Sequence, residues 1–409
     1  MAVADRAMSV RVSHRLAGAL LAGLAVSACG GGGGGGGDGG NGADVSAVSC
    51  DTFDCTGMLE NLATNVMRPT FVDFQAAAGE LETDIGAYCN ALDTTGEDAD
   101  AAFEAAKNSW KEAMAVWQHA EVMQLGPLAE NSGELRDTIY SWPFTNTCTV
   151  DQDVINAEQP DFDIAARTLE RRGLDALEYV LFTSSLDHTC PPNVTVTQGW
   201  NARPEAERRQ ARCEFAALAA GDVATQADDL VTRWDAFASQ LTNPADPAAT
   251  VNEVSDALFY VEDETKDVKL RVPLGLSSNS CDGQPCPEDV ESRHSKTSKD
   301  NVRNNLVAFQ TLFLGNEAGA NDDRLGFDDF LNQEDPNVSS LMESAVAGAI
   351  ESVSDNNFPG TMYDDLENTD GNLVAAAQSA AKVLTDQLKE DFINVLGLQI
   401  PGSAAGDGD

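Results

Sequence analysis

Two carboxylates lie three positions apart in RRGLDALEYV, residues 171–180, a stretch that otherwise reads as a buried helix. At 100° per residue, Glu178 falls inside the apolar stripe of this helix and Asp175 falls at its edge. A carboxylate that faces a core is costly unless it is paired, hydrogen-bonded or bound to a metal. Asp175 and Glu178 are therefore candidate metal ligands. The alternative is that Arg171, Arg172 or a later base pairs with Glu178 and makes it structural.

Other charged and hydroxyl side chains could complete a site around Glu178. Glu121 falls on the same face as Trp117 of an expected helix and is the third candidate metal ligand. The candidate ligand-binding residues from later segments are Arg271, Glu291, Ser292 and Ser295. Carboxylates interspersed with bases such as Lys269 fit two interpretations, a site for a metal or an anionic ligand and an internal salt-bridge network. The sequence leaves both open.

The N-terminus carries an export signal. Three arginines precede an apolar run over residues 16–26, which is too short to span a bilayer as a mature helix. The run ends in VSAC, which resembles the site at which bacterial lipoproteins are cut and lipidated. We expect residues 1–28 to be a lipoprotein signal peptide and Cys29 to carry lipid that anchors the protein to a membrane. The alternative is an ordinary signal whose cysteine is incidental.

Residues 29–47 are rich in glycine and lack periodic apolar positions, so we expect a flexible linker. Gly30 stands where an aspartate would favour retention in the inner membrane, and the resemblance to lipoproteins therefore implies the outer membrane. The expected location is the bacterial cell envelope, facing the periplasm or the cell surface. A formal net charge of −42 excludes nucleic acid as a partner and would concentrate cations.

Eight cysteines follow Cys29, an even number that indicates up to four disulfides in an exported chain. Eight cysteines allow 105 pairings. Two pairs, Cys50 with Cys55 and Cys281 with Cys286, are close enough in sequence to close small loops. The expected pairs are Cys50–Cys55, Cys281–Cys286, Cys148–Cys190 and Cys89–Cys213.

Helical periodicity dominates the remainder of the chain, and the best strand pattern, residues 194–198, is short enough that a loop is expected. A segment rich in proline, NPADPAAT at 243–250, interrupts the helical pattern. We therefore expect an all-α fold of two packed helical bundles, over residues 48–243 and 244–409. The expected long helices cover 99–123, 204–240, 249–268, 287–314, 337–353 and 371–396, with short pieces at 137–142 and 150–155 around a Trp-Pro loop.

Several segments resemble one known family when taken in order. They are NSWKEAMAVWQHAEVMQLGP, YSWPF, GLDALEYVLF, KDVKLRVPLGL, VESRHSKTSKDNVRNN and the terminal LGLQIPGSAAGDGD. The order resembles the imelysin-like proteins of bacterial envelopes, in which a helix ending in GP, a WP loop, a G-x-H-x-x-E helix and an ES-x-x-S segment recur. The resemblance implies two helical bundles with the motif near their interface. The family was grouped with metallopeptidases, and some members are tied to iron regulation or uptake.

The motif histidine is Asp175 here, whereas Gly173 and Glu178 match the family pattern. The chain has neither HExxH nor a histidine pair at helical spacing, and we expect His119 and His294 to be exposed or structural. A zinc peptidase normally needs at least two nitrogen ligands. Enzymatic activity is therefore left undecided, and the favoured cofactor is a divalent or ferric cation, iron above all, with no metal as the alternative.

The favoured function is a lipid-anchored envelope protein that binds a metal ion related to iron, or a small ligand, at the junction of the two bundles. Protein partners from iron uptake would then be expected in the envelope. The alternatives are a metallopeptidase and a non-catalytic scaffold protein.

Overall fold

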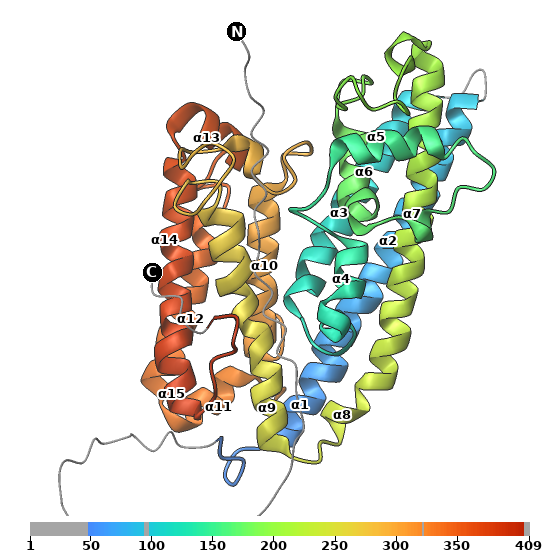
Figure 1. The fold of residues 1–409 in the computed structure, drawn as a ribbon. Helices are drawn as coiled ribbons and strands as arrows, with labels where there is room; N and C mark the ends of the chain where they lie inside the picture. Colours follow the sequence, from blue (N-terminus) through green and yellow to red (C-terminus); the bar gives the residue numbers. More distant parts are fainter. Residues whose placement is uncertain (1–47, 94–97, 321–322, 405–409) are drawn as a thin grey trace, which may run out of the picture. The chain divides into compact units, whose positions relative to one another are not determined.

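The computed structural model describes residues 48–93, 98–320 and 323–404, and within these ranges every regular element is helical (Figure 1). The all-α prediction is confirmed, and residues 194–198 lie in turns as expected. The predicted signal peptide, the glycine-rich linker and Cys29 lie outside the described residues. In the described part of the chain, no helix combines the length and the apolar character needed to cross a membrane.

Three long helices, α2, α3 and α7, dominate the first half, and α2 packs against both of the others. The apolar face of α3 buries Trp110 and Trp117, as its periodicity predicts, and Asp98 caps its start by accepting a 3.0 Å hydrogen bond from the backbone nitrogen of Ala101. The helices are α1 (Cys55–Asn61), α2 (Arg68–Asp93), α3 (Ala99–Val122), α4 (Glu134–Ile139), α5 (Thr147–Asn156), α6 (Gly173–Phe182), α7 (Glu205–Phe237) and α8 (Ser239–Thr242).

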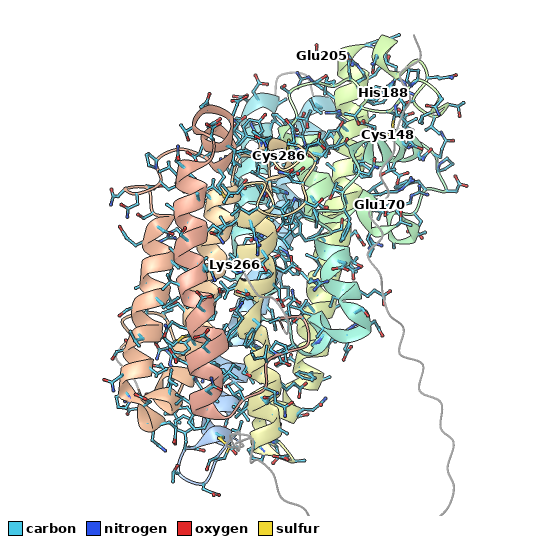
Figure 2. All side chains as sticks on the ribbon, turned by 60° about the vertical axis from the view of Figure 1, so that its left-hand side comes forward. Cys148, Glu170, His188, Glu205, Lys266 and Cys286 are labelled. Carbon is cyan, nitrogen blue, oxygen red and sulfur yellow. A yellow bond between two sulfur atoms is a disulfide. The ribbon has the colours of Figure 1, made fainter. Side chains whose placement is uncertain are left out.

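The second half is a group of shorter helices in which α12 and α14 pack side by side (Figure 1). Its helices are α9 (Pro247–Ser255), α10 (Ser298–Leu314), α11 (Phe327–Glu334), α12 (Pro336–Ser352), α13 (Met362–Thr369), α14 (Asn372–Gln387) and α15 (Ile393–Leu396). A π-helical segment, Val261–Arg271, follows α9 after a short 3₁₀ turn. It packs against α14 and turns the side chains of Lys266, labelled in Figure 2, and Lys269 into the interior, where both are fully buried.

The two halves meet where α3 packs against α10, and one continuous apolar core extends through both. Helix α1 also joins them, because the Asn61 side chain at its end donates hydrogen bonds to the backbone oxygens of Gly315 (2.8 Å) and Leu325 (2.9 Å). Residues 243–246 lie between α8 and α9, residues 247–250 form the start of α9, and the division into domains there stays a prediction.

Most predicted helices occur close to their expected limits, but the helix expected over 287–314 is wrong at its start. It begins at Ser298, and residues 287–297 consist of a 3₁₀ turn, Pro287–Asp289, followed by irregular backbone. Ser292 and Lys296 both have positive φ angles, 49° and 60°, which an α-helix does not admit. This unwound segment supplies part of the site described below.

All four predicted disulfides are confirmed. Cys148–Cys190 ties α5 to the loop after α6, and Cys89–Cys213 joins α2 to α7 across 124 positions of sequence. The other two, Cys50–Cys55 and Cys281–Cys286, each close a loop with a sequence separation of 5.

Candidate functional site

Helix α6 begins at a glycine that the local geometry requires. Gly173 has a φ angle of +84°, and a Cβ atom there would lie 2.6 Å from the backbone oxygen of Ile139 and 3.0 Å from that of Thr138. The first turn of α6 therefore lies directly on the end of α4. This close approach sets Asp175 beside Ser141, the residue before the Trp-Pro loop.

Asp175 is 4% exposed, and only one of its carboxyl oxygens has a partner. Oδ2 accepts a 2.8 Å hydrogen bond from the Ser141 hydroxyl, whereas Oδ1 is buried without a hydrogen bond. Burial raises the pKa of Asp175 to about 7, although the Ser141 hydroxyl works in the opposite direction. The side chain can therefore change between its neutral and charged forms near neutral pH.

Glu178 lies one turn later and is also buried. Its Oε1 accepts hydrogen bonds from the backbone nitrogens of His294 (2.9 Å) and Ser295 (2.7 Å). Burial raises the pKa of Glu178 to about 7, and the nearby Asp175 charge raises it further, while these hydrogen bonds lower it.

The arginines that could have paired with Glu178 are occupied elsewhere. Arg172 forms a buried bidentate pair with Asp222, at 2.7 Å and 2.5 Å, and Arg171 lies 3.4 Å from an oxygen of Asp153. Pairing of Glu178 with Arg171 or Arg172 is therefore wrong. Backbone donors satisfy this carboxylate instead.

The segment 287–297, which the sequence predicts to be helical, provides those donors. Glu291, Ser292 and Ser295 thus lie in the unwound segment before α10 and do not begin that helix. The Ser295 hydroxyl donates to the backbone oxygen of Ser292 (3.2 Å), and the Asn301 amide on α10 donates to the Ser292 hydroxyl (2.9 Å). The helical prediction failed because side chains on α6 and α10 hold this backbone in another shape.

A cavity of about 220 Å³ lies between α6, the Trp-Pro loop and this segment. Asp175, Glu178 and Ser292 line it. The lining also includes residues that the sequence did not indicate, among them Trp142, Tyr179, Glu288, Asp289 and His294. Arg293 and Glu288 at its wall pair with each other at 2.8 Å. The lining is thus mainly polar, with the two protonatable carboxyls of α6 facing the segment from the second half.

His294 was expected to be exposed or structural, yet it is part of this lining. Burial lowers the pKa of His294 to about 4, so the imidazole is neutral at physiological pH. Its ring centroid lies 5.6 Å from that of Tyr179 on α6. The sequence offered one weak indication that His294 belongs to the site, because it lies between two candidate ligand-binding residues, Ser292 and Ser295.

Glu121 and Glu291 belong to a separate buried network between the halves. Lys269 forms ion pairs with Glu121 and with Glu291 (3.1 Å), and it donates to the side-chain oxygens of Gln118 (2.7 Å) and Asn305 (2.8 Å). Burial works against the charged form of Lys269, but the two carboxylates outweigh it and raise its pKa. Of the two interpretations that the sequence left open, the internal salt-bridge network thus applies to Glu121 and Glu291.

Tyr140 connects this network to the cavity. Its hydroxyl donates a 3.0 Å hydrogen bond to Glu291, and it directly precedes Ser141, which holds Asp175. Burial raises the pKa of Tyr140 well above its usual value, and four carboxylates raise it further, namely Glu291, Glu121, Glu178 and Asp175. The sequence did not indicate this role, because a tyrosine beside Trp-Pro fits any core.

The structure thus brings together Asp175, Glu178, Ser292 and the backbone of Ser295. Glu291 directly precedes Ser292 but does not line the cavity. Arg271 does not line the cavity; it lies 3.7 Å from Asp267. Across the described ranges, no group of three or more His, Cys, Asp or Glu residues is arranged to hold a metal ion. Metal binding by Glu178, Asp175 and Glu121 remains a prediction.

The site has donors and acceptors suited to a small polar ligand or a hard cation. Four carboxyl groups, those of Asp175, Glu178, Glu288 and Asp289, surround the space together with several hydroxyls, the Arg293 guanidinium and one neutral imidazole. Carboxylate oxygens favour hard cations, and binding such an ion would displace the protons that Asp175 and Glu178 hold near neutral pH.

Comparisons with known proteins agree with this architecture. The sequence model of the family described as Imelysin matches residues 67–390. Iron-regulated protein A of Synechococcus elongatus is 24% identical over 371 residues, which cover 83% of this chain and 89% of that protein.

Two solved structures share the fold. An imelysin-like protein from Psychrobacter arcticum has a TM-score of 0.65 and 18% identity, covering 87% of this chain and 99% of that one. A putative iron-regulated protein A precursor from Parabacteroides distasonis has a TM-score of 0.62 and 16% identity, covering 84% and 94%.

Proposed function

The chain belongs to the imelysin family, and from this premise we propose that it is a lipid-anchored envelope protein that binds iron in the cavity around Asp175 and Glu178. The names of the Synechococcus and Parabacteroides proteins refer to iron regulation, which supports iron as the ion. Binding in the envelope would make the protein a carrier or sensor for uptake partners. In its broader form, the proposal is that this cavity binds a small polar ligand.

The observation that carries the proposal is the unpartnered Oδ1 of Asp175 beside Glu178. A buried acceptor without a hydrogen bond costs about 1–3 kcal/mol, which a cation or a donor group would recover. Burial holds both carboxyls partly protonated near pH 7, so the protein without a ligand avoids two uncompensated charges. An incoming cation would replace the protons and use the same oxygens.

The test measures metal content and metal affinity of the mature chain carrying Cys29→Ser. Metal-stripped protein is titrated with ferrous iron under anaerobic conditions, with ferric citrate, and with manganese and calcium. We expect one ion per chain, lost in Asp175→Asn and in Glu178→Gln. Binding that persists in both variants would place the site elsewhere, and no binding of any ion would favour the scaffold alternative.

Asp328 provides a matched control on α11. Its pKa is also raised to about 7 by burial, and its Oδ1 also lacks a hydrogen bond, but it does not line the cavity. Asp328→Asn therefore removes a similar carboxyl elsewhere, and we expect it to keep the full metal content.

The anchor is tested separately. Cys29→Ser should move the protein from the membrane fraction to the soluble periplasmic fraction and abolish incorporation of labelled fatty acid. Unchanged membrane association of the variant would overturn the lipoprotein proposal and leave the cavity proposal intact.

A further inference from the structure

A second cavity, of about 300 Å³, lies between α2, α3, α6 and α7. It shares no lining residue with the cavity around Asp175, because Val180, Leu181 and Phe182 of α6 contribute here. Its volume is at the lower end of the range of about 300–1,000 Å³ that is typical of small-molecule sites.

The charge of this cavity is opposite to that of the chain. Its lining includes three bases, Lys107, Arg209 and Arg212, and no aspartate or glutamate. The chain as a whole has 67 acidic residues against 25 lysines and arginines, so a lining with only basic charges is unusual here. Such a lining favours an anion.

Lys107 and Arg209 are held by carboxylates outside the lining. Lys107 pairs with Glu104 at 2.8 Å, and Arg209 pairs with Glu205 at 2.7 Å. Both glutamates are largely exposed, with side chains 63% accessible, and such surface pairs are weak. An anion in the cavity can therefore compete for both bases.

Arg212 is the buried base of the cavity, with only 3% of its surface exposed. Its Nη1 donates to the backbone oxygen of Ser185 at 3.0 Å, but Nε and Nη2 have no hydrogen-bond partner. Nη2 forms an ion pair with Asp151 at 3.6 Å, and both side chains are 4% accessible. Arg212 therefore adds positive charge to this end of the cavity while keeping its pair with Asp151, and Lys107 and Arg209 are the bases that can exchange partners for an anion.

The remaining wall is apolar and aromatic. The Tyr88 and Phe103 rings lie 4.8 Å apart, and the Lys107 ammonium lies 5.2 Å from the centroid of Phe103 and 5.6 Å from that of Phe182. A ligand that places an anionic group near the bases would set its body against these rings. Inorganic ions lack such a body.

We propose that this second cavity binds a small organic monocarboxylate with an aromatic or short aliphatic body. The carboxylate faces Lys107, Arg209 and Arg212, and the body packs against Tyr88, Phe103 and Phe182. This site is independent of the proposed iron function, because it uses a different lining.

Calorimetric titration of the mature chain tests the proposal with benzoate, hexanoate, benzyl alcohol and sulfate as probes. We expect at least one of the two carboxylates to bind, and benzyl alcohol and sulfate to bind about tenfold more weakly. The double variant Lys107→Gln/Arg209→Gln should weaken carboxylate binding by about tenfold or more. Both substitutions lie in partly exposed pairs, so the fold should remain, which circular dichroism checks.

Two control variants test whether carboxylates bind in this cavity and nowhere else on the chain. Arg68→Gln removes an equivalent charge from an exposed pair with Asp235 and should leave binding unchanged. Glu178→Gln should also leave it unchanged, whatever its effect on iron. The proposal is overturned if neither carboxylate binds at millimolar concentration, if the neutral alcohol binds as well as benzoate, or if the double variant binds like the wild type.

Discussion

Oε1 of Glu178 lies 2.7 Å from the backbone nitrogen of Ser295, a residue 117 positions later in the chain. A carboxylate on α6 in the first half thereby holds the unwound segment that precedes α10 in the second half. The neighbouring backbone nitrogen of His294 shares the same oxygen. Glu178 is therefore a structural link between the halves as well as a candidate ligand, and the two roles need separate tests.

Replacing Glu178 with Ala should lower the free energy of unfolding by about 2–4 kcal/mol, because two partly buried backbone donors lose their acceptor. Glu178→Gln keeps an oxygen at this position and should cost about 1 kcal/mol or less. Urea unfolding of metal-free protein measures both values. Equal losses in the two variants would show that the hydrogen bonds to His294 and Ser295 are not what makes Glu178 important for stability.

The stability of metal-free protein should depend on Asp175 and Glu178 between about pH 4 and pH 7. Burial raises both pKa values to about 7, so the folded state binds more protons than the unfolded state in this interval. Stability contributed by these groups is therefore present below the unfolded pKa values and declines as the pH rises towards 7. Subtracting the pH profile of Asp175→Asn/Glu178→Gln from that of the wild type should reveal a decline of about 6 kcal/mol for the two groups together. A flat difference would contradict the assignment.

The sequence predicted most of the long helices because their apolar periodicity is a local signal, but it gave no prediction for α2. It predicted the burial of Glu178 for the same reason, since the leucines of α6 define its buried face. The four disulfide pairs also agree with prediction, although only the two short loops had a local argument.

The sequence could not predict what lies opposite Asp175 and Glu178. The backbone donors of His294 and Ser295 depend on positive φ angles at Ser292 and Lys296, which tertiary contacts impose on a segment with a helical pattern. Glu121 fell on the correct helix face, but the sequence could not show that Lys269 would face it. Pairing across the chain is set by packing between the halves.

Gly173→Ala should be destabilising by about 1–3 kcal/mol, since it combines a left-handed backbone with a Cβ only 2.6 Å from the Ile139 oxygen. The start of α6 would have to shift, which should also weaken metal binding by moving Asp175 away from Ser141. Gly79→Ala is the control, because its Cβ meets nothing within 4 Å on α2 and should stabilise by about 0.5–1 kcal/mol. Thermal unfolding compares them. If Gly173→Ala behaved like Gly79→Ala, the close approach of α6 to α4 would be refuted.

Lys269→Met should be among the most damaging single substitutions. It leaves Glu121 and Glu291 buried without their cation, which costs about 3–5 kcal/mol. Adding Glu121→Gln and Glu291→Gln removes both uncompensated charges and should restore much of the loss. Lys296→Met, which breaks an exposed pair with Asp364, should change stability by about 1 kcal/mol or less. Denaturant unfolding measures the stability of these variants. A triple variant no more stable than Lys269→Met would show that burial of uncompensated charge does not cause the loss of stability.

The Cys89–Cys213 disulfide should contribute more to stability than Cys50–Cys55, because it closes a much longer loop. The sequence separations are 124 and 5, and the loss of loop entropy in the unfolded chain predicts contributions of about 5 and about 2 kcal/mol. Paired cysteine-to-serine variants, compared by urea unfolding under non-reducing conditions, measure the two values. Since Cys89 and Cys213 join α2 to α7, their loss should loosen the walls of the second cavity and weaken binding of monocarboxylates there. Equal destabilisation by the two double variants would mean that local packing, and not loop length, sets the contribution of each bridge.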